Sequence, residues 1–103
     1  MDQRVKGQPI AHLHGVEFTL VDPNVHVACH ILPETLAYLR DRFLSGLRGS
    51  PIELFHQLRE QILQLATAKL AAGSFESNGW LCLRVGDAIE LFARAFREGD
   101  QVP

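Results

Sequence analysis

Apolar and polar residues alternate with a period of two in two stretches near the start of the chain, residues 16–20 and 25–31. Alternation that includes β-branched residues is typical of strands with one buried face. Asp22, Pro23 and Asn24 lie between the stretches and suit a tight turn, because proline presets φ and asparagine tolerates a positive φ. The pattern predicts a β-hairpin whose buried face carries Val16, Phe18, Leu20, Val27, Cys29 and Ile31.

The apolar period then changes to three and four residues, which predicts helices. A first helix is expected from Pro33 to Gly46. Residues 50–53, Ser-Pro-Ile-Glu, form a capping-box sequence with proline at the first helical position, so a long helix is expected over residues 50–72. A short third helix is expected to start at Asp87, which would be its N-cap.

A third strand is expected from Trp80 to Val85, which makes the order β-β-α-α-β-α. This order predicts an α+β fold, in which one long and two shorter helices pack on a small, mainly antiparallel, three-stranded sheet. Residues 1–15 mix Gly, Pro, Gln and His without a sustained period, and we expect a loosely ordered N-terminal arm there. Residues 16–99 would form a single domain, and residues 100–103 a tail.

The composition excludes several classes of protein. Among 103 residues, 47% are hydrophobic and 21% charged, unlike disordered, collagen-like or disulfide-framework chains. The formal net charge of −2 provides no field that would attract nucleic acid or anionic lipid. No apolar run approaches the ~20 residues of a membrane span, and the first residues lack the apolar core of a signal peptide, so a cytoplasmic location is expected.

Candidate catalytic and metal-binding groups form no known motif. The sequence lacks GxSxG, P-loop and GxGxxG patterns, and Cys29 and Cys82 lack CxxC spacing, so both thiols are expected to be inert and reduced. His26 and His30 would lie about 13 Å apart on one strand, too far to share an ion. We expect no metal and no cofactor; His30 would pair with Glu17 or approach His14.

Two cations interrupt the apolar stripe of the predicted long helix, Arg59 and Lys69. A cation in such a stripe must extend to solvent or meet a carboxylate. Glu34 is the candidate carboxylate, because helices joined by a short loop run antiparallel. We therefore expect Glu34 to pair with Arg59 or Lys69; alternatively, these three residues bind an anionic ligand.

The last predicted helix is apolar over more than half of its circumference. A small domain covers a helix on one side only, so part of this arc would be exposed in a monomer. A symmetric homodimer would cover it. The expected interface residues are Leu91, Phe92, Ala95 and Phe96.

The stretch from Val16-Glu17-Phe18 to Cys29-His30-Ile31-Leu32-Pro33-Glu34-Thr35-Leu36 resembles a bacterial family called domain of unknown function 1488. Asn24 stands where that family usually has glycine. The resemblance covers residues 16–90 and implies a compact α+β fold in small bacterial proteins, without implying an activity. The family's long-helix motif is matched by Phe55, Arg59, Ile62, Ala66, Lys69 and Gly73, and the strand before Gly86 is also similar.

These observations favour a non-enzymatic interaction or regulatory module that forms a homodimer or binds another protein. A small anionic-ligand-binding or enzymatic protein using Arg59 is the second hypothesis, and a nucleic-acid-binding regulator is the third. An apolar surface patch would favour the first, a deep polar pocket around Arg59 the second, and a contiguous basic stripe the third.

Overall fold

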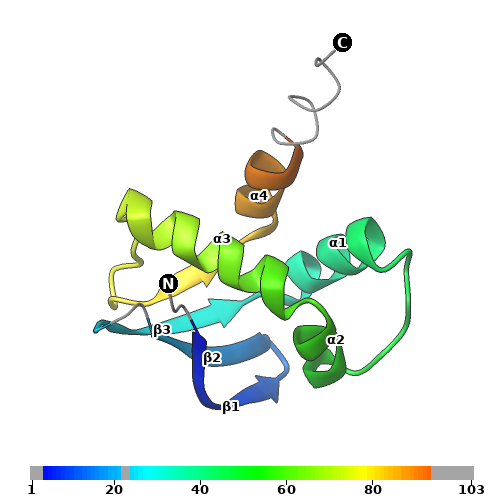
Figure 1. The fold of residues 1–103 in the computed structure, drawn as a ribbon, viewed down its shortest axis with the longest axis horizontal. Helices are drawn as coiled ribbons and strands as arrows, with labels where there is room; N and C mark the ends of the chain where they lie inside the picture. Colours follow the sequence, from blue (N-terminus) through cyan, green and yellow to red (C-terminus); the bar gives the residue numbers. More distant parts are fainter. Residues whose placement is uncertain (1–3, 22–23, 94–103) are drawn as a thin grey trace.

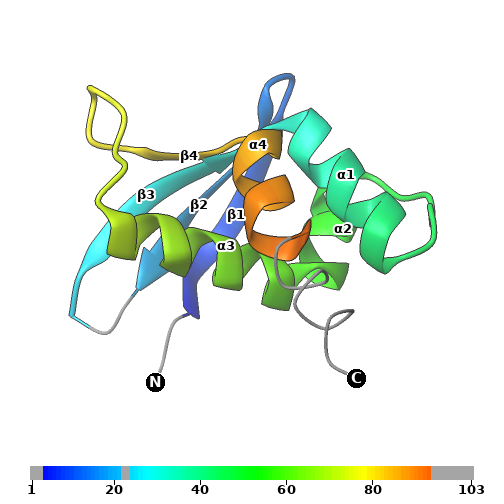
Figure 2. The same ribbon diagram turned by 90° about the horizontal axis from the view of Figure 1, so that it is seen from above.

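Helices cover one face of a four-stranded mixed sheet in the computed structural model, which describes residues 4–21 and 24–93 (Figures 1 and 2). The strands lie side by side in chain order: β1 (Arg4–His12), β2 (Gly15–Val21), β3 (His26–Ile31) and β4 (Leu81–Leu83). The helices are α1 (Pro33–Phe43), α2 (Pro51–Gln57), α3 (Arg59–Ala72) and α4 (Val85–Ala88), followed by a π-helical turn, η1 (Ile89–Ala93). The α+β class is confirmed, and none of the described helices is long and apolar enough to cross a membrane.

The predicted hairpin is confirmed as the antiparallel pair β2–β3. Its register places Val16 opposite Ile31 and Phe18 opposite Cys29. All six apolar residues of the predicted face are at most 6% exposed and belong to the core beneath the helices. A shift of one residue would turn this whole set toward solvent, so burial selects the register.

The prediction of three strands is wrong, because residues 4–12 of the expected N-terminal arm form β1, which pairs antiparallel with β2. The register shifts between Lys6 and Ile10, and Gly7 has a φ of +72° within that irregularity. A bulge interrupts the alternation of faces, and an edge strand buries few side chains, so no period of two marks this strand. The single domain over residues 16–99 and the tail at residues 100–103 stay predictions.

The sheet is mixed: β1–β2 and β2–β3 are antiparallel pairs, whereas β4 pairs parallel to β3. All three residues of β4 are buried although the strand lies at the edge of the sheet. Parallel neighbours need a long crossover connection, and α1, α2 and α3 supply it here. The observed order is therefore β-β-β-α-α-α-β-α, and η1 is the last described element.

The expected single helix over residues 50–72 is divided at Leu58 into α2 and α3. The capping box that starts α2 is confirmed: the Ser50 hydroxyl accepts from the Glu53 amide, and the Glu53 carboxylate accepts from the Ser50 amide. Leu58 is fully buried, with φ −103° and ψ 15°. The break lets α2 pack on β1 and β2 while α3 packs on β4. No proline or glycine marks it, so packing rather than local sequence sets its position.

Candidate functional site

Two hollows lie along α3, between that helix and the segment formed by α4 and η1; Figure 2 shows α4 beside α3. Together the hollows form a groove, which we call the α3 groove. Its wider part has a volume of about 690 Å³ and lies between α3 and η1, lined by Glu60, Leu63, Gln64, Ala68, Leu91 and Phe92 among others. A second part of about 320 Å³ lies between α3 and α4 and includes Lys69, Ala72, Ser74, Asp87 and Glu90. Ala68 and Leu91 line both parts, so the two hollows adjoin.

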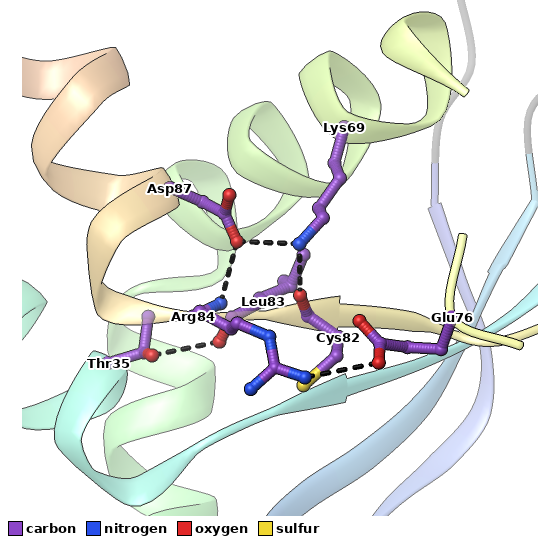
Figure 3. A network of polar contacts seen from close by, with 7 residues as sticks. All are labelled: Thr35, Lys69, Glu76, Cys82, Leu83, Arg84 and Asp87. Carbon is purple, nitrogen blue, oxygen red and sulfur yellow. Dashed lines mark hydrogen bonds and ion pairs between the residues drawn. The ribbon is translucent and has the colours of Figure 1, made fainter. Parts of the chain in front are cut away.

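Lys69 connects the two walls of the α3 groove (Figure 3). Its Nζ donates to Oδ2 of Asp87 at 2.7 Å and to the carbonyl oxygen of Cys82 at 2.6 Å. The Lys69 side chain is 9% exposed and that of Asp87 31%. A charged group removed from water needs such partners, and charge-assisted hydrogen bonds are the stronger kind. Lys69 therefore does meet a carboxylate, which is Asp87 rather than the expected Glu34.

Asp87 also fixes the start of α4. Its Oδ2 accepts from the backbone amide of Arg84 at 2.9 Å, which is the residue that precedes the helix. The expectation that Asp87 is the N-cap is corrected, because it is the third residue of α4. A carboxylate in the first turn is favourable to the helix dipole. One carboxylate thus orients α4 and holds it to α3.

Two further contacts anchor β4 and its flanking loop (Figure 3). The hydroxyl of Thr35, at the start of α1, donates to the carbonyl oxygen of Leu83 at 2.8 Å, and Thr35 is fully buried. Arg84 donates from Nη2 to Oε1 of Glu76 at 3.1 Å on the exposed side. Thr35 thus ties β4 to α1, and Lys69, through the Cys82 carbonyl oxygen, ties β4 to α3.

The structure does not join the three residues that we expected to act together. Arg59 is half-buried at the first position of α3, and Glu34 is exposed in the first turn of α1. Over the ranges 4–21 and 24–93, neither residue forms an ion pair with the other or with Lys69. Of the three, Lys69 lines the α3 groove. The break at Leu58 divides the long helix that was expected to bring Arg59 and Glu34 together. Anion binding at Arg59 stays a prediction.

The expected interface residues on η1 lie at the groove. Leu91 is half-buried and Phe92 is 9% exposed, while Ala95 and Phe96 lie outside the described residues. The opposite wall includes Leu63 and Ala68 on α3, neither of which was among the expected interface residues. Leu63 is an apolar residue of the predicted long helix, but a helical pattern alone does not separate a groove wall from a core face.

The histidines make contacts between the β1–β2 turn and β3. Glu17 and His30 lie opposite each other in the β2–β3 register, as expected. The Glu17 carboxylate, however, contacts His12, whose Nε2 lies 2.8 Å from Oε2 of Glu17. Instead, Nε2 of His30 lies 2.6 Å from the carbonyl oxygen of His14, which confirms the approach of His14 to His30. Within the described ranges, no group of three or more His, Cys, Asp or Glu is arranged to hold a metal ion.

Both cysteines are buried free thiols. Burial raises the pKa of Cys29 to about 12. Burial also raises the pKa of Cys82, although the nearby Arg84 guanidinium acts in the opposite direction. Because the thiolate is the reactive form, both groups are poor nucleophiles in the folded protein.

The raised pKa of Cys29 predicts a loss of stability in alkaline solution. The unfolded thiol ionises near its ordinary value of 9.0, whereas the folded thiol keeps its proton up to about 12. Above pH 9 the folded state binds more protons than the unfolded state, so the free energy of unfolding falls as the pH rises toward 12. Below pH 9 the thiol keeps its proton in both states, and this loss of stability is absent. Urea unfolding at about pH 8 and about pH 10.5 should show a smaller alkaline loss for Cys29→Ala than for the wild type. Equal losses would contradict the prediction.

Comparisons with known proteins agree with this fold. A family model described as "Protein of unknown function (DUF1488)" matches residues 10–83, a range that reaches from β1 to the end of β4 and stops before α4. A crystal structure of a DUF1488-family protein from Shewanella loihica PV-4 is similar, with a TM-score of 0.61 and 18% identity over 80% of this chain and 92% of that chain. No curated protein matches. Since the family model covers well over half of the sequence, the chain belongs to the DUF1488 family.

Proposed function

We propose that this protein is a non-enzymatic, cytoplasmic interaction module that self-associates through the α3 groove. The observation that carries the proposal is the wide part of the groove, about 690 Å³, whose walls include Leu63 and Ala68 on one side and Leu91 and Phe92 on the other. Apolar surface in a groove between helices is characteristic of protein–protein contact sites.

The polar groups of the groove argue against a small polar ligand. Specific ligand sites combine an apolar pocket with a few polar groups aimed into it. Here Lys69 donates to Asp87 and to the Cys82 carbonyl oxygen, so its charge is already paired within the fold. The wide part combines the polar side chains of Glu60, Gln64 and Thr67 with the apolar groups of Leu63, Ala68, Leu91 and Phe92. The apolar portion suits apolar side chains of another chain.

Exposed apolar residues beside the groove support a second copy as the partner. Ile89, on η1, is 45% exposed, and Phe43, on α1, is 39% exposed and stacks edge-on against Phe92 with ring centroids 5.0 Å apart. A homodimer with two-fold symmetry uses one patch on both subunits, so an apolar face of this kind can cover itself.

Self-association is tested by Ala68→Glu, with Ala71→Glu as the matched control. Both alanines are exposed on α3, but Ala68 lines the groove and Ala71 does not. In sedimentation velocity at tens of micromolar, the wild type and Ala71→Glu are expected to be dimers. Ala68→Glu should raise the dimer dissociation constant by at least about tenfold, because a charge would be buried at the contact. A monomeric wild type, or equal behaviour of both variants, would contradict the proposal.

A further inference from the structure

We propose that the β1–β2 turn carries a pH-sensitive switch, in which protonation of His12 releases the turn from β3. The switch consists of His12, His14, Glu17 and His30, and we call it the histidine switch. None of these four residues lines the α3 groove, so the inference is independent of the proposed function. It follows from the role of each ring nitrogen in its hydrogen bond and from the position of the turn against β3.

The β1–β2 turn lies directly against the last residues of β3. His12 is paired with Gly15 in the β1–β2 register, which leaves a two-residue turn between them. A Cβ on Gly15 would lie 2.0 Å from the carbonyl oxygen of Ile31 and 3.2 Å from Nε2 of His30. Leu13, in the turn, is 92% exposed, so burial of its side chain does not hold the turn in place. Polar contacts of the histidines hold it instead.

His12 holds the turn as a neutral ring. Its Nδ1 accepts a hydrogen bond from the backbone amide of His14 at 3.2 Å, and a ring nitrogen that accepts carries no proton. Its Nε2 lies 2.8 Å from Oε2 of Glu17, and an ionised carboxylate only accepts, so Nε2 carries the ring proton. The two neighbours of His12 thus select the neutral tautomer that is protonated at Nε2.

His30 makes the second contact with the turn. Its Nε2 donates to the carbonyl oxygen of His14 at 2.6 Å, because a carbonyl oxygen only accepts. The ring centroids of His12 and His30 are 5.4 Å apart. The amide and the carbonyl of His14 are therefore each held by a histidine ring, one from β1 and one from β3.

Protonation of His12 breaks the first contact and weakens the second. The charged ring keeps its Nε2–H bond to Glu17, because the carboxylate attracts the added charge. Nδ1 becomes a donor, however, and then faces the N–H group of His14. Once His30 is also protonated, two cationic rings lie side by side and repel each other. His14 then leaves both rings, and the turn separates from β3.

The remaining titratable groups on this face leave the sign of the effect unchanged. Cys82 lies opposite His30 in the β3–β4 register, and its thiol stays protonated because burial raises its pKa. The guanidinium of Arg84, two residues further on, is paired with Glu76. Glu17 is the carboxylate in contact with His12, and it holds the ring rather than the turn.

The titratable groups of α2 lie on the other side of the sheet. Val16 and Phe18, on either side of Glu17, are buried in the core beneath the helices, so the Glu17 side chain points to the opposite face. Helix α2 packs against β1 and β2 on the core side. Glu53 and His56 of α2 therefore do not face the histidine switch.

NMR spectroscopy of the wild-type protein tests the switch. At about pH 8, long-range proton–nitrogen spectra should show the His12 ring protonated at Nε2. When the pH is lowered to about 5, the amide proton of His14 should shift upfield in step with the titration of the His12 ring, because its hydrogen bond is lost. A constant His14 amide shift, or a proton on Nδ1 of His12 at the higher pH, would overturn the inference.

Two variants assign the transition to His12. His12→Asn retains a side-chain oxygen as the acceptor for the His14 amide but has no group that titrates in this range, so that amide should stay constant between the same two pH values. His26→Asn is the matched control, because His26 is an exposed histidine at the opposite end of β3, and it should titrate like the wild type. If His12→Asn still shows the His14 transition, another group causes it and the inference is overturned.

Discussion

Gly15→Ala is expected to reduce the free energy of unfolding by roughly 4 kcal/mol or more, which is among the largest effects of a single substitution. A Cβ at this position would lie 2.0 Å from the carbonyl oxygen of Ile31 and 3.0 Å from its carbonyl carbon. Gly15 also has a φ of +122°, which side chains rarely permit. The clash is with backbone, and Ile31 is paired with Val16 in the β2–β3 ladder, so relief requires disrupting the centre of the sheet.

Gly7→Ala is the matched control for this effect. Gly7 has a φ of +72° in β1, but no atom lies within 4 Å of the position that a Cβ would take. The cost should therefore be the conformational one alone, about 1 kcal/mol. Urea unfolding gives the loss in the free energy of unfolding for each variant. The difference between the two losses is the cost of the close backbone contact at Gly15, because both positions have a positive φ. Equal losses would show that the approach to Ile31 is not the cause.

Lys69→Met is expected to cost about 2–3 kcal/mol, because it preserves much of the side-chain volume and leaves Asp87 and the Cys82 carbonyl oxygen without their donor. The figure lies below the cost for a fully buried pair, since the Asp87 side chain is 31% exposed and water can partly replace the ammonium. Asp87 would keep its bond to the Arg84 amide. The loss is measured by urea unfolding monitored by circular dichroism.

Arg84→Met provides the comparison for an exposed pair. Nη2 of Arg84 lies 3.1 Å from Oε1 of Glu76, and the two side chains are 53% and 37% exposed. Because solvent screens such an exposed pair, the change should have little effect on stability. A double variant, Lys69→Met with Asp87→Asn, should cost less than the sum of its two single changes, because the two groups interact directly. Strict additivity would contradict a coupled pair that holds α3 to α4.

Local sequence patterns were sufficient to predict elements in which alternate residues are buried, and helix starts at which neighbouring residues form the cap. The hairpin face from Val16 to Ile31 and the capping box at Ser50 were predicted correctly for these reasons. The edge strand β1 was missed because the irregularity at Gly7 shifts the faces and because its side chains are mostly exposed. The break at Leu58 was missed because it arises from packing against the sheet, without proline or glycine.

The candidate site was predicted only in outline. Lys69 was chosen as a cation within an apolar stripe, and Leu91 and Phe92 as part of an apolar arc too wide for one buried face. All three line the α3 groove. The partner of Lys69 was not predictable, because Asp87 is 18 residues away and meets it only after β4 has joined the sheet. The opposite groove wall at Ala68 could not be recognised either, since an exposed alanine has no distinguishing chemistry.

The amino-acid sequence by itself determined the α+β class, the face and register of the β2–β3 hairpin, and the starts of α1 and α2, because each of these depends on neighbouring residues and on the burial of apolar area. The tertiary structure alone decided the parallel direction of β4, the pairing of Lys69 with Asp87 and the shape of the α3 groove. The physical reason is that these features depend on contacts between residues far apart in the sequence. A strand's direction and an ion pair between distant segments follow from how the crossover through α1, α2 and α3 returns the chain to the sheet, and no local period encodes that return.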